Sequence, residues 1–141
     1  MRWLASSLAL LLALGCAQPA PKAPAGDGLV GPVWQLVRFR GGDDRVLAPI
    51  DKTHYTLQFR ADGTVSARID CNRGQGGYKT TGTSGIEFGP MAITRAMCPP
   101  GSMHDHVVRQ LPHVRSYVIR NGRLFLSLMA DGGTYEFEPA R

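Results

Sequence analysis

The three cysteines of this 141-residue chain are the side chains whose type and position most clearly indicate chemistry. Cys16 closes an apolar N-terminal run, whereas Cys71 and Cys98 flank a glycine-rich stretch in the middle of the chain. An odd number of cysteines in an exported protein leaves one thiol that needs an explanation. If Cys16 accepts a lipid, the other two are free to pair, so we predict one acylated cysteine and one disulfide.

The N-terminus has the features of a bacterial export signal. Arg2 supplies the positive charge, and residues 8–14 form an apolar core far shorter than the roughly 20 residues of a membrane-spanning helix. Residues 13–16, Ala-Leu-Gly-Cys, resemble the lipobox, in which small residues precede the cysteine that becomes acylated. We predict a lipoprotein signal peptide at residues 1–15 and lipidation of Cys16. An ordinary secretory signal, or a buried free cysteine, is the alternative.

Residues 16–30 are rich in Ala, Pro and Gly, a composition that cannot bury a core and that favours extended conformations. We expect them to tether a domain at residues 31–141 to the membrane. Ala17 follows the cysteine, and by resemblance to the sorting rule of bacteria with two membranes, the absence of Asp there favours the outer membrane. The expected location is the cell envelope, with the lipid-anchored domain facing the periplasm.

The chain is basic, with a formal net charge of +5 from 16 Lys and Arg against 11 Asp and Glu. Because the chain is predicted to be exported, we expect no nucleic-acid partner. Anionic lipid, lipopolysaccharide or an acidic protein would suit this charge, and an ordinary solvated surface would also account for it. No internal repeat is evident, and we expect a monomer.

A bond between Cys71 and Cys98 would close a loop of about 27 residues, which stabilises by roughly 3 to 4 kcal/mol in the chain-entropy model. A redox-active pair or two unpaired thiols are the alternatives. Zinc or copper would suit Cys98 with His54, His104 and His106, but the spacing fits no known framework. On a helix His104 and His106 would point about 200° apart. We therefore expect surface histidines, no metal and no cofactor.

Signatures of catalysis are weak. Ser84 and Ser102 lack the Gly-x-Ser-x-Gly pattern of a nucleophile elbow. Residues 74–77, Gly-Gln-Gly-Gly, lack the Lys and the strand-to-helix setting of a phosphate loop, so we predict a flexible hairpin connection there. We expect no catalytic residues and no enzyme activity, with a hydrolase or redox enzyme as the remaining alternative.

The elements that must position these residues are mostly short β-strands, since apolar and polar residues alternate with a period of two. The clearest such segments are residues 34–40, 55–60, 64–70, 114–120, 123–129 and 134–138. Asn121-Gly122 predicts a tight turn between two of them. In residues 134–138, the alternation places Tyr135 and Phe137 inward, and Glu136 and Glu138 outward.

One segment has a helical pattern. Met103, Val107 and Leu111 recur at four-residue spacing, Ser102 begins a possible capping box, and Pro112 would end the helix. About seven strands and one helix predict a mainly β (α+β) fold. In this fold a small antiparallel sheet curls into an open or cracked barrel with one short α-helix.

A series of motifs across about residues 33–139 resembles the META domain, the HslJ-like family of bacterial envelope lipoproteins. The motifs are Asp70-Cys71-Asn72-Arg73, Gly77-Tyr78, residues 86–92, and Thr94-Arg95-Ala96-Met97-Cys98. The resemblance identifies Asn72, Arg73, Gly77, Tyr78, Thr94 and Arg95 as family-motif residues. It implies a small antiparallel β domain with one helix, associations with stress response, antibiotic tolerance and secretion, and no common catalytic activity. Asp70 and Ala67 stand where family members often have glycine.

The resulting expectation is a non-catalytic envelope lipoprotein that binds a partner protein or supports envelope integrity under stress. The alternative is a carrier that encloses a fatty acid or phospholipid tail in a small barrel. The two differ in the barrel interior: side chains fill it in the first case, and line a void of a few hundred Å³ in the second.

Overall fold

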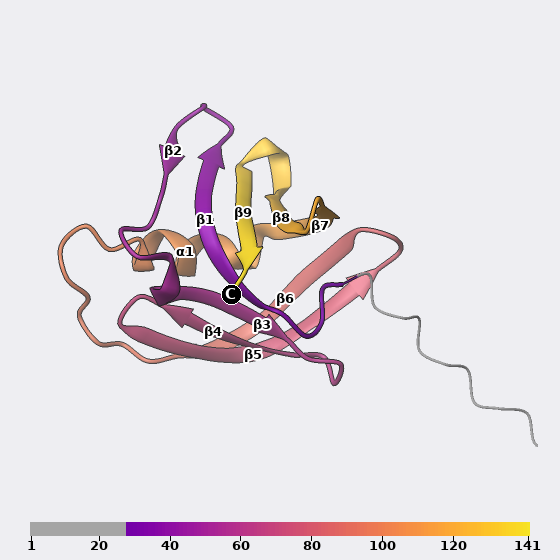
Figure 1. The fold of residues 1–141 in the computed structure, drawn as a ribbon, viewed down its shortest axis with the longest axis horizontal. Helices are drawn as coiled ribbons and strands as arrows, with labels where there is room; N and C mark the ends of the chain where they lie inside the picture. The colour runs from indigo at the N-terminus through magenta and orange to yellow at the C-terminus, as the bar shows by residue number, and fades with distance from the viewer. Residues whose placement is uncertain (1–27) are drawn as a thin grey trace, which may run out of the picture.

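A computed structural model describes residues 28–141, and within them the chain forms nine strands and one α-helix (Figure 1). The strands are β1 (Val33–Gly41), β2 (Val46–Leu47), β3 (Tyr55–Phe59), β4 (Thr64–Ile69), β5 (Asn72–Thr81), β6 (Gly85–Ile93), β7 (Val114–Arg120), β8 (Arg123–Leu128) and β9 (Gly133–Pro139). The helix is α1 (His104–Gln110), and single 3₁₀ turns are η1 (Lys52–His54), η2 (Leu111–His113) and η3 (Met129–Asp131).

Eight of the described strands, all except β2, form one closed antiparallel barrel. Neighbours along the chain pair in order from β3 to β9, and β1 closes the ring by pairing with both β3 and β9. The predicted mainly β fold with one short helix is therefore confirmed, and the barrel is closed. The pairing around the barrel is least extensive between β6 and β7, which pair only at Gly85 and Ser116. Next to this pair, the Tyr117 N–H donates to the Ser84 carbonyl at 2.8 Å.

The strands form where alternation places apolar side chains on the inner face. β3 buries Tyr55, Leu57 and Phe59, and β8 buries its three leucines. Burial of one such side chain contributes roughly 1.5 to 3 kcal/mol, so the core is the main source of stability. In β9 the side chain of Glu136 points outward as predicted, but it is buried beneath the guanidinium groups of Arg38 and Arg123.

The prediction of a flexible connection at residues 74–77 is wrong, because this run lies inside β5. A methyl group on Gly76 would lie 2.7 Å from the Pro90 carbonyl oxygen, and one on Gly74 would lie 3.2 Å from a side-chain carbon of Ile93. The glycines therefore permit close approach of β5 and β6, whose register shifts between Gly76 and Tyr78. A strand built from glycine has no apolar alternation, which explains why the pattern did not reveal it.

The helix packs through its predicted face: Met103, Val107 and Leu111 are all buried. The predicted capping box is only partly present. The hydroxyl oxygen of Ser102 accepts the backbone N–H of His104 at 3.1 Å, whereas the Asp105 carboxylate contacts the His104 ring. The α-helix ends at Gln110, and η2, which contains Pro112, follows it.

The barrel begins slightly before the predicted domain boundary. Leu29 is buried, its carbonyl accepts the indole N–H of Trp34 at 3.0 Å, and Val30 bridges to Phe59. These two residues of the predicted tether therefore belong to the domain. The predicted signal peptide and Cys16 lie outside the described residues. None of the helices in residues 28–141 is long and apolar enough to span a bilayer.

Candidate functional site at the disulfide end of the barrel

The chemistry predicted for the central cysteines is located at one end of the barrel. Cys71, in the tight turn from β4 to β5, is joined to Cys98 in the loop that follows β6, with Cα atoms 5.5 Å apart. Asp70 enters this turn with φ +56°, and its N–H donates to the His54 carbonyl at 2.8 Å. Glycine adopts this left-handed conformation freely and Asp tolerates it, which accounts for the substitution noted at this position.

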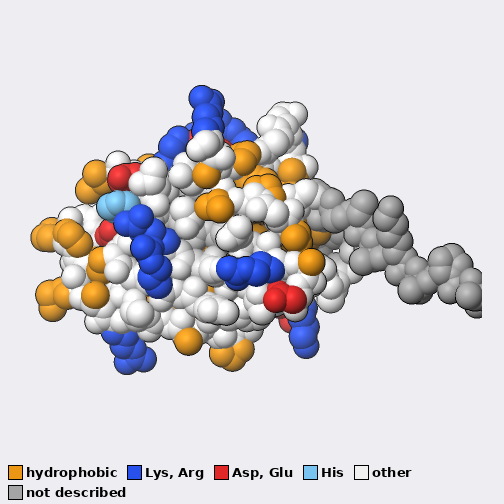
Figure 2. Space-filling model, turned by 60° about the horizontal axis from the view of Figure 1, so that its bottom comes forward, with side chains coloured by type: hydrophobic (Ala, Val, Ile, Leu, Met, Phe, Trp, Pro, Cys, Tyr) orange, Lys and Arg blue, Asp and Glu red, His pale blue; other side chains and the backbone are white. Residues whose placement is uncertain are grey.

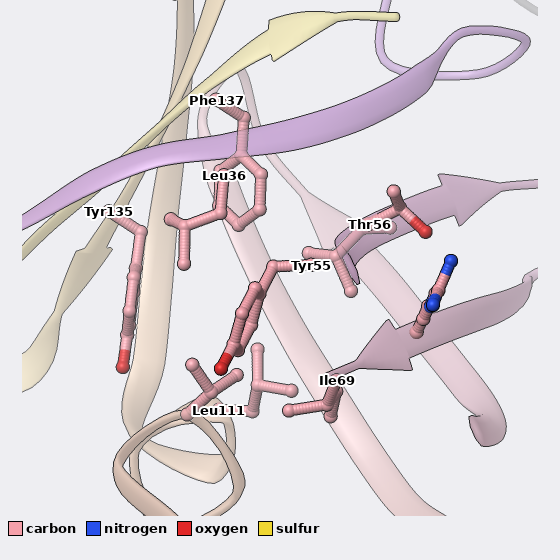
Figure 3. Close-up of a pocket in the computed structure, with 10 residues that line it drawn as sticks. Leu36, Tyr55, Thr56, Ile69, Leu111, Tyr135 and Phe137 are labelled. Carbon is pink, nitrogen blue, oxygen red and sulfur yellow. The ribbon is translucent and has the colours of Figure 1, made fainter. Parts of the chain in front are cut away.

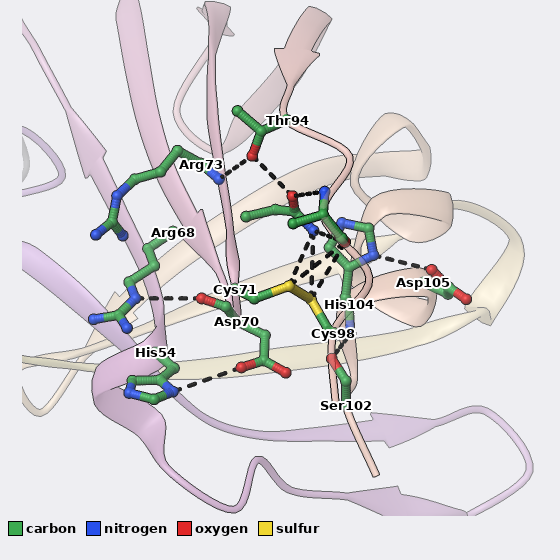
Figure 4. Close-up of a disulfide and its surroundings, with 12 residues drawn as sticks. His54, Arg68, Asp70, Cys71, Arg73, Thr94, Cys98, Ser102, His104 and Asp105 are labelled. Atoms are coloured by element: carbon green, nitrogen blue, oxygen red, sulfur yellow. Dashed lines mark hydrogen bonds and ion pairs between the residues drawn. A yellow bond between two sulfur atoms is a disulfide. The ribbon is translucent and has the colours of Figure 1, made fainter. Parts of the chain in front are cut away.

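Asn72 is a second link between the same two segments. Its side chain is completely buried, and its carbonyl oxygen accepts the backbone N–H of Ala96 at 2.7 Å and the hydroxyl of Thr94 at 2.8 Å. Its amide nitrogen donates to the Ala96 carbonyl at 2.9 Å. A buried amide needs such partners. The motif residues Asn72 and Thr94 therefore hold the loop against β5 beside the disulfide (Figure 4). We call this arrangement the latch: the Cys71–Cys98 disulfide, Asn72, Thr94 and Ala96.

The other motif residues divide between the latch and the rest of β5. Arg73 joins the latch through its backbone: its N–H donates to the Thr94 hydroxyl, and its carbonyl accepts the Thr94 N–H. Gly77 and Tyr78 lie further along β5, where the Tyr78 hydroxyl donates to the Arg60 carbonyl at 2.8 Å. Arg95 is exposed. The structure thus brings Asn72, Arg73 and Thr94 together. Tyr78 packs its ring against Phe59, and Gly77 precedes it in β5.

Tyr55, which no motif identified, holds the far side of the loop together with Ser102. The Tyr55 hydroxyl oxygen accepts the backbone N–H of Met103 at 2.8 Å and lies 3.2 Å from the Ser102 hydroxyl. Burial is the main reason why the pKa of Tyr55 is raised. The alternation in residues 55–60 is consistent with the buried position of Tyr55, but no sequence signal predicted where its hydroxyl group would bind.

The histidines differ from the predicted surface positions. His106 is half-buried, with its ring 4.5 Å from the Phe39 ring and 5.9 Å from the Tyr135 ring, and burial lowers its pKa. His104 is also half-buried, because the start of α1 packs against the barrel, and its Nδ1 lies 2.9 Å from Asp105. Among residues 28–141, no three His, Cys, Asp or Glu side chains gather in a group that could hold a metal ion.

These features define a small closed β-barrel. At one end, a disulfide and the hydrogen bonds of Asn72 hold a loop against the sheet. A family model of the META domain matches residues 27–141, so the chain belongs to the META domain family. This confirms the resemblance drawn from the motifs.

Solved structures give the same fold. A protein from Burkholderia xenovorans, determined by NMR, has a TM-score of 0.66 and 23% identity, covering 87% of this chain and 97% of that one. A DUF4847 family protein from Bacteroides vulgatus, determined by crystallography, has a TM-score of 0.57 and 19% identity, covering 78% and 93% of the two chains. At these identities the likeness supports the fold alone. A comparison with curated proteins finds no match.

Proposed function

We propose that this META domain protein is a non-catalytic envelope lipoprotein, anchored through Cys16 and sorted to the outer membrane. In this proposal it supports envelope integrity under stress by binding a partner at the surface of its barrel. The observation that carries the proposal is the filled interior: the inward side chains form one buried core, and the pocket among them measures only about 10 Å³, roughly the space for a single water.

The side chains that line this space come from the neighbouring strands β9, β1, β3 and β4 and from the helical segment (Figure 3). They include Leu36, Tyr55, Ile69, Leu111, Tyr135 and Phe137. An acyl chain enclosed by the barrel would have to displace several of them. This argues against the enclosed-carrier alternative and in favour of action at the outer surface.

The arrangement of Ser102, His104 and Asp105 also supports a non-catalytic role. The Ser102 hydroxyl oxygen accepts the N–H of His104 and lies near the Tyr55 hydroxyl, so it has a structural role in the loop. The Nε2 atom of His104 is buried and has no hydrogen-bond partner, so this ring is not positioned to activate the serine.

A second candidate function follows from an open groove beside β6. It measures about 420 Å³ and lies between β6 and the α1–η2 segment. Its lining is mainly apolar, with Phe88, Met91, Ile93, Val108, Leu111 and Pro112. A fatty acid or phospholipid tail would bind here as a surface ligand.

Crosslinking of the lipidated protein in its native envelope, followed by mass spectrometry of co-purifying proteins and lipids, tests both functions. A specific protein supports the first, and a stoichiometric lipid supports the second. Labelling with a radioactive fatty acid, compared between the wild type and Cys16→Ala, tests the anchor. Labelling that persists in the variant, or well-folded protein that crosslinks to neither class, would contradict the proposal. Ester hydrolysis abolished by Ser102→Ala would contradict its non-catalytic part.

A further inference from the structure

The loop held by the latch presents apolar side chains to solvent. Met97 and Ile50 are 99% and 89% exposed, the highest values among the large hydrophobic residues described. Met97 lies between Ala96, whose N–H and carbonyl both bind Asn72, and Cys98 in the disulfide. A methyl group on Gly101 would lie 3.4 Å from the Ile50 side chain, so Ile50 lies against the same loop. The latch thus holds Met97 outward, and Ile50 lies beside the same loop. We call these two side chains the apolar tip.

Two arginines beside the latch lie next to each other, and their like charges repel. Arg68 and Arg73 are direct partners in the antiparallel register of β4 and β5. Like charges at such positions repel each other. Arg68 donates only to the backbone carbonyl of Asp70, at 3.3 Å, and within residues 28–141 neither guanidinium forms an ion pair with a carboxylate. Both extend toward the same side of the molecule, away from the disulfide (Figure 4).

The rest of the outer face of β3, β4 and β5 also carries basic and polar side chains. Its other outward residues are polar or basic: Thr56, Gln58, Arg60, Ser66, Gln75 and Lys79. The nearby carboxylates of Asp51 and Asp62 each accept hydrogen bonds within their own turns, from Thr53 and Thr64. Asp70 lies at the margin beside His54, and Glu87 lies opposite Lys79. Figure 2 shows basic side chains spread across this face, with hydrophobic groups protruding at one end.

We infer that this basic face and the apolar tip together dock the domain on an anionic phospholipid surface. Guanidinium groups bind phosphate oxygens with paired hydrogen bonds. Protruding apolar side chains suit the boundary between headgroups and acyl chains. The inference rests on the proposed export to the envelope. It adds a second membrane contact, located at the end of the barrel opposite the point where the described chain begins (Figure 1).

The test measures vesicle binding without the lipid anchor. The chain from residue 17 onward lacks Cys16 but keeps the whole closed barrel and its core. Its cosedimentation is compared between phosphatidylglycerol-containing vesicles and phosphatidylcholine vesicles. Binding to the first alone, weakened by added salt, is the expected result, because salt screens surface charge.

Matched variants separate this surface from general basicity. Each arginine near an anionic surface strengthens binding about fivefold. The double variant Arg68→Ser with Arg73→Ser should therefore weaken binding roughly 25-fold. Arg40→Ser with Arg109→Ser removes the same charge elsewhere and should change binding little. Met97→Asp should weaken binding roughly 10-fold or more, whereas Val46→Asp, at an exposed residue of β2, should have a much smaller effect. Circular dichroism confirms the fold of each variant.

Three results would overturn the inference: no binding to anionic vesicles by the folded wild type, equal losses in the test and control pairs, or unchanged binding by Met97→Asp. If poly-glutamate binds through Arg68 and Arg73 while vesicles do not, the surface serves an acidic protein. Fatty-acid labelling of Cys16 tests the proposed anchor separately, so failure of vesicle binding leaves that proposal standing.

Discussion

The two sides of the barrel are stabilised by different means. In β7, β8 and β9, alternating side chains such as Leu124, Leu126 and Phe137 interlock, and hydrophobic burial stabilises the sheet. In β5 and β6, glycines bring the backbones close together, and few large side chains are fully buried. There the disulfide and Asn72 hold the loop in place. Where a strand lacks apolar side chains, a few specific bonds provide the stability.

The leucine-rich side should show the largest single loss on truncation. Leu126→Ala leaves a cavity at a side chain with no exposed surface, and should lower the free energy of unfolding by about 2 to 5 kcal/mol in urea titrations. Val118→Ala, at a half-exposed residue on the neighbouring strand, is the control and should cost under about 0.5 kcal/mol. Similar losses in the two variants would contradict the comparison.

Removal of the disulfide should have nearly as large an effect. Cys71→Ser with Cys98→Ser releases a crosslink of sequence separation 27 and should lower the free energy of unfolding by roughly 3 to 4 kcal/mol. Wild type with reductant should reach the same urea midpoint as the variant. In denaturant without reductant, the mature acylated protein should show no titratable thiol. Two free thiols per molecule would mean that the pair does not form.

The amide of Asn72 should contribute less than the disulfide but more than a surface hydrogen bond. Asn72→Ala leaves the N–H and carbonyl of Ala96 without their partner and should cost about 2 to 3 kcal/mol. Thr94→Val removes only the hydroxyl and should cost about 1 kcal/mol. Amide exchange should accelerate in the loop and leave β8 unchanged. Equal acceleration in both regions would show that Asn72 stabilises the whole domain and not only the loop.

The glycines of β5 should differ from one another. Gly76→Ala places a methyl group 2.7 Å from the Pro90 carbonyl oxygen and should cost about 1 to 3 kcal/mol. Gly77→Ala meets nothing closer than the Gly63 carbonyl oxygen at 3.7 Å, so it should be tolerated. Thermal unfolding of the two variants measures the difference, and equal melting temperatures would contradict the close-approach explanation.

The smallest expected effect is a pH dependence from His106. Burial lowers the pKa of His106 in the folded state below its usual value, so the unfolded chain binds the proton more readily. Stability from the neutral ring is present above about pH 6.5, the unfolded pKa, and decreases as the pH falls through the folded pKa. His106→Leu should flatten this decrease between pH 7 and 5. An unchanged profile would exclude the ring as the cause.

The sequence predicted the parts of the molecule that depend on periodicity and composition. Period-two alternation located six strands within one or two residues, and four-residue spacing located the buried face of α1. The alternation did not predict β5 and β6, because glycine and proline interrupt the apolar pattern in both strands. In the candidate site, the motifs identified Asn72 and Thr94. The hydrogen bonds of Asn72 to Ala96, 24 residues along the chain, and to Thr94 depend on tertiary placement of the loop. The Tyr55 hydroxyl contact has the same origin.

The single pair between β6 and β7 leaves most of one margin of β6 without a neighbouring strand in the described barrel. Such a margin is a template on which another molecule can extend the sheet, and natural proteins often interrupt it with proline. Pro90 occupies the middle of β6, is exposed, and has no N–H to offer to an incoming chain. Pro90 thus limits the addition of another strand along this margin of β6.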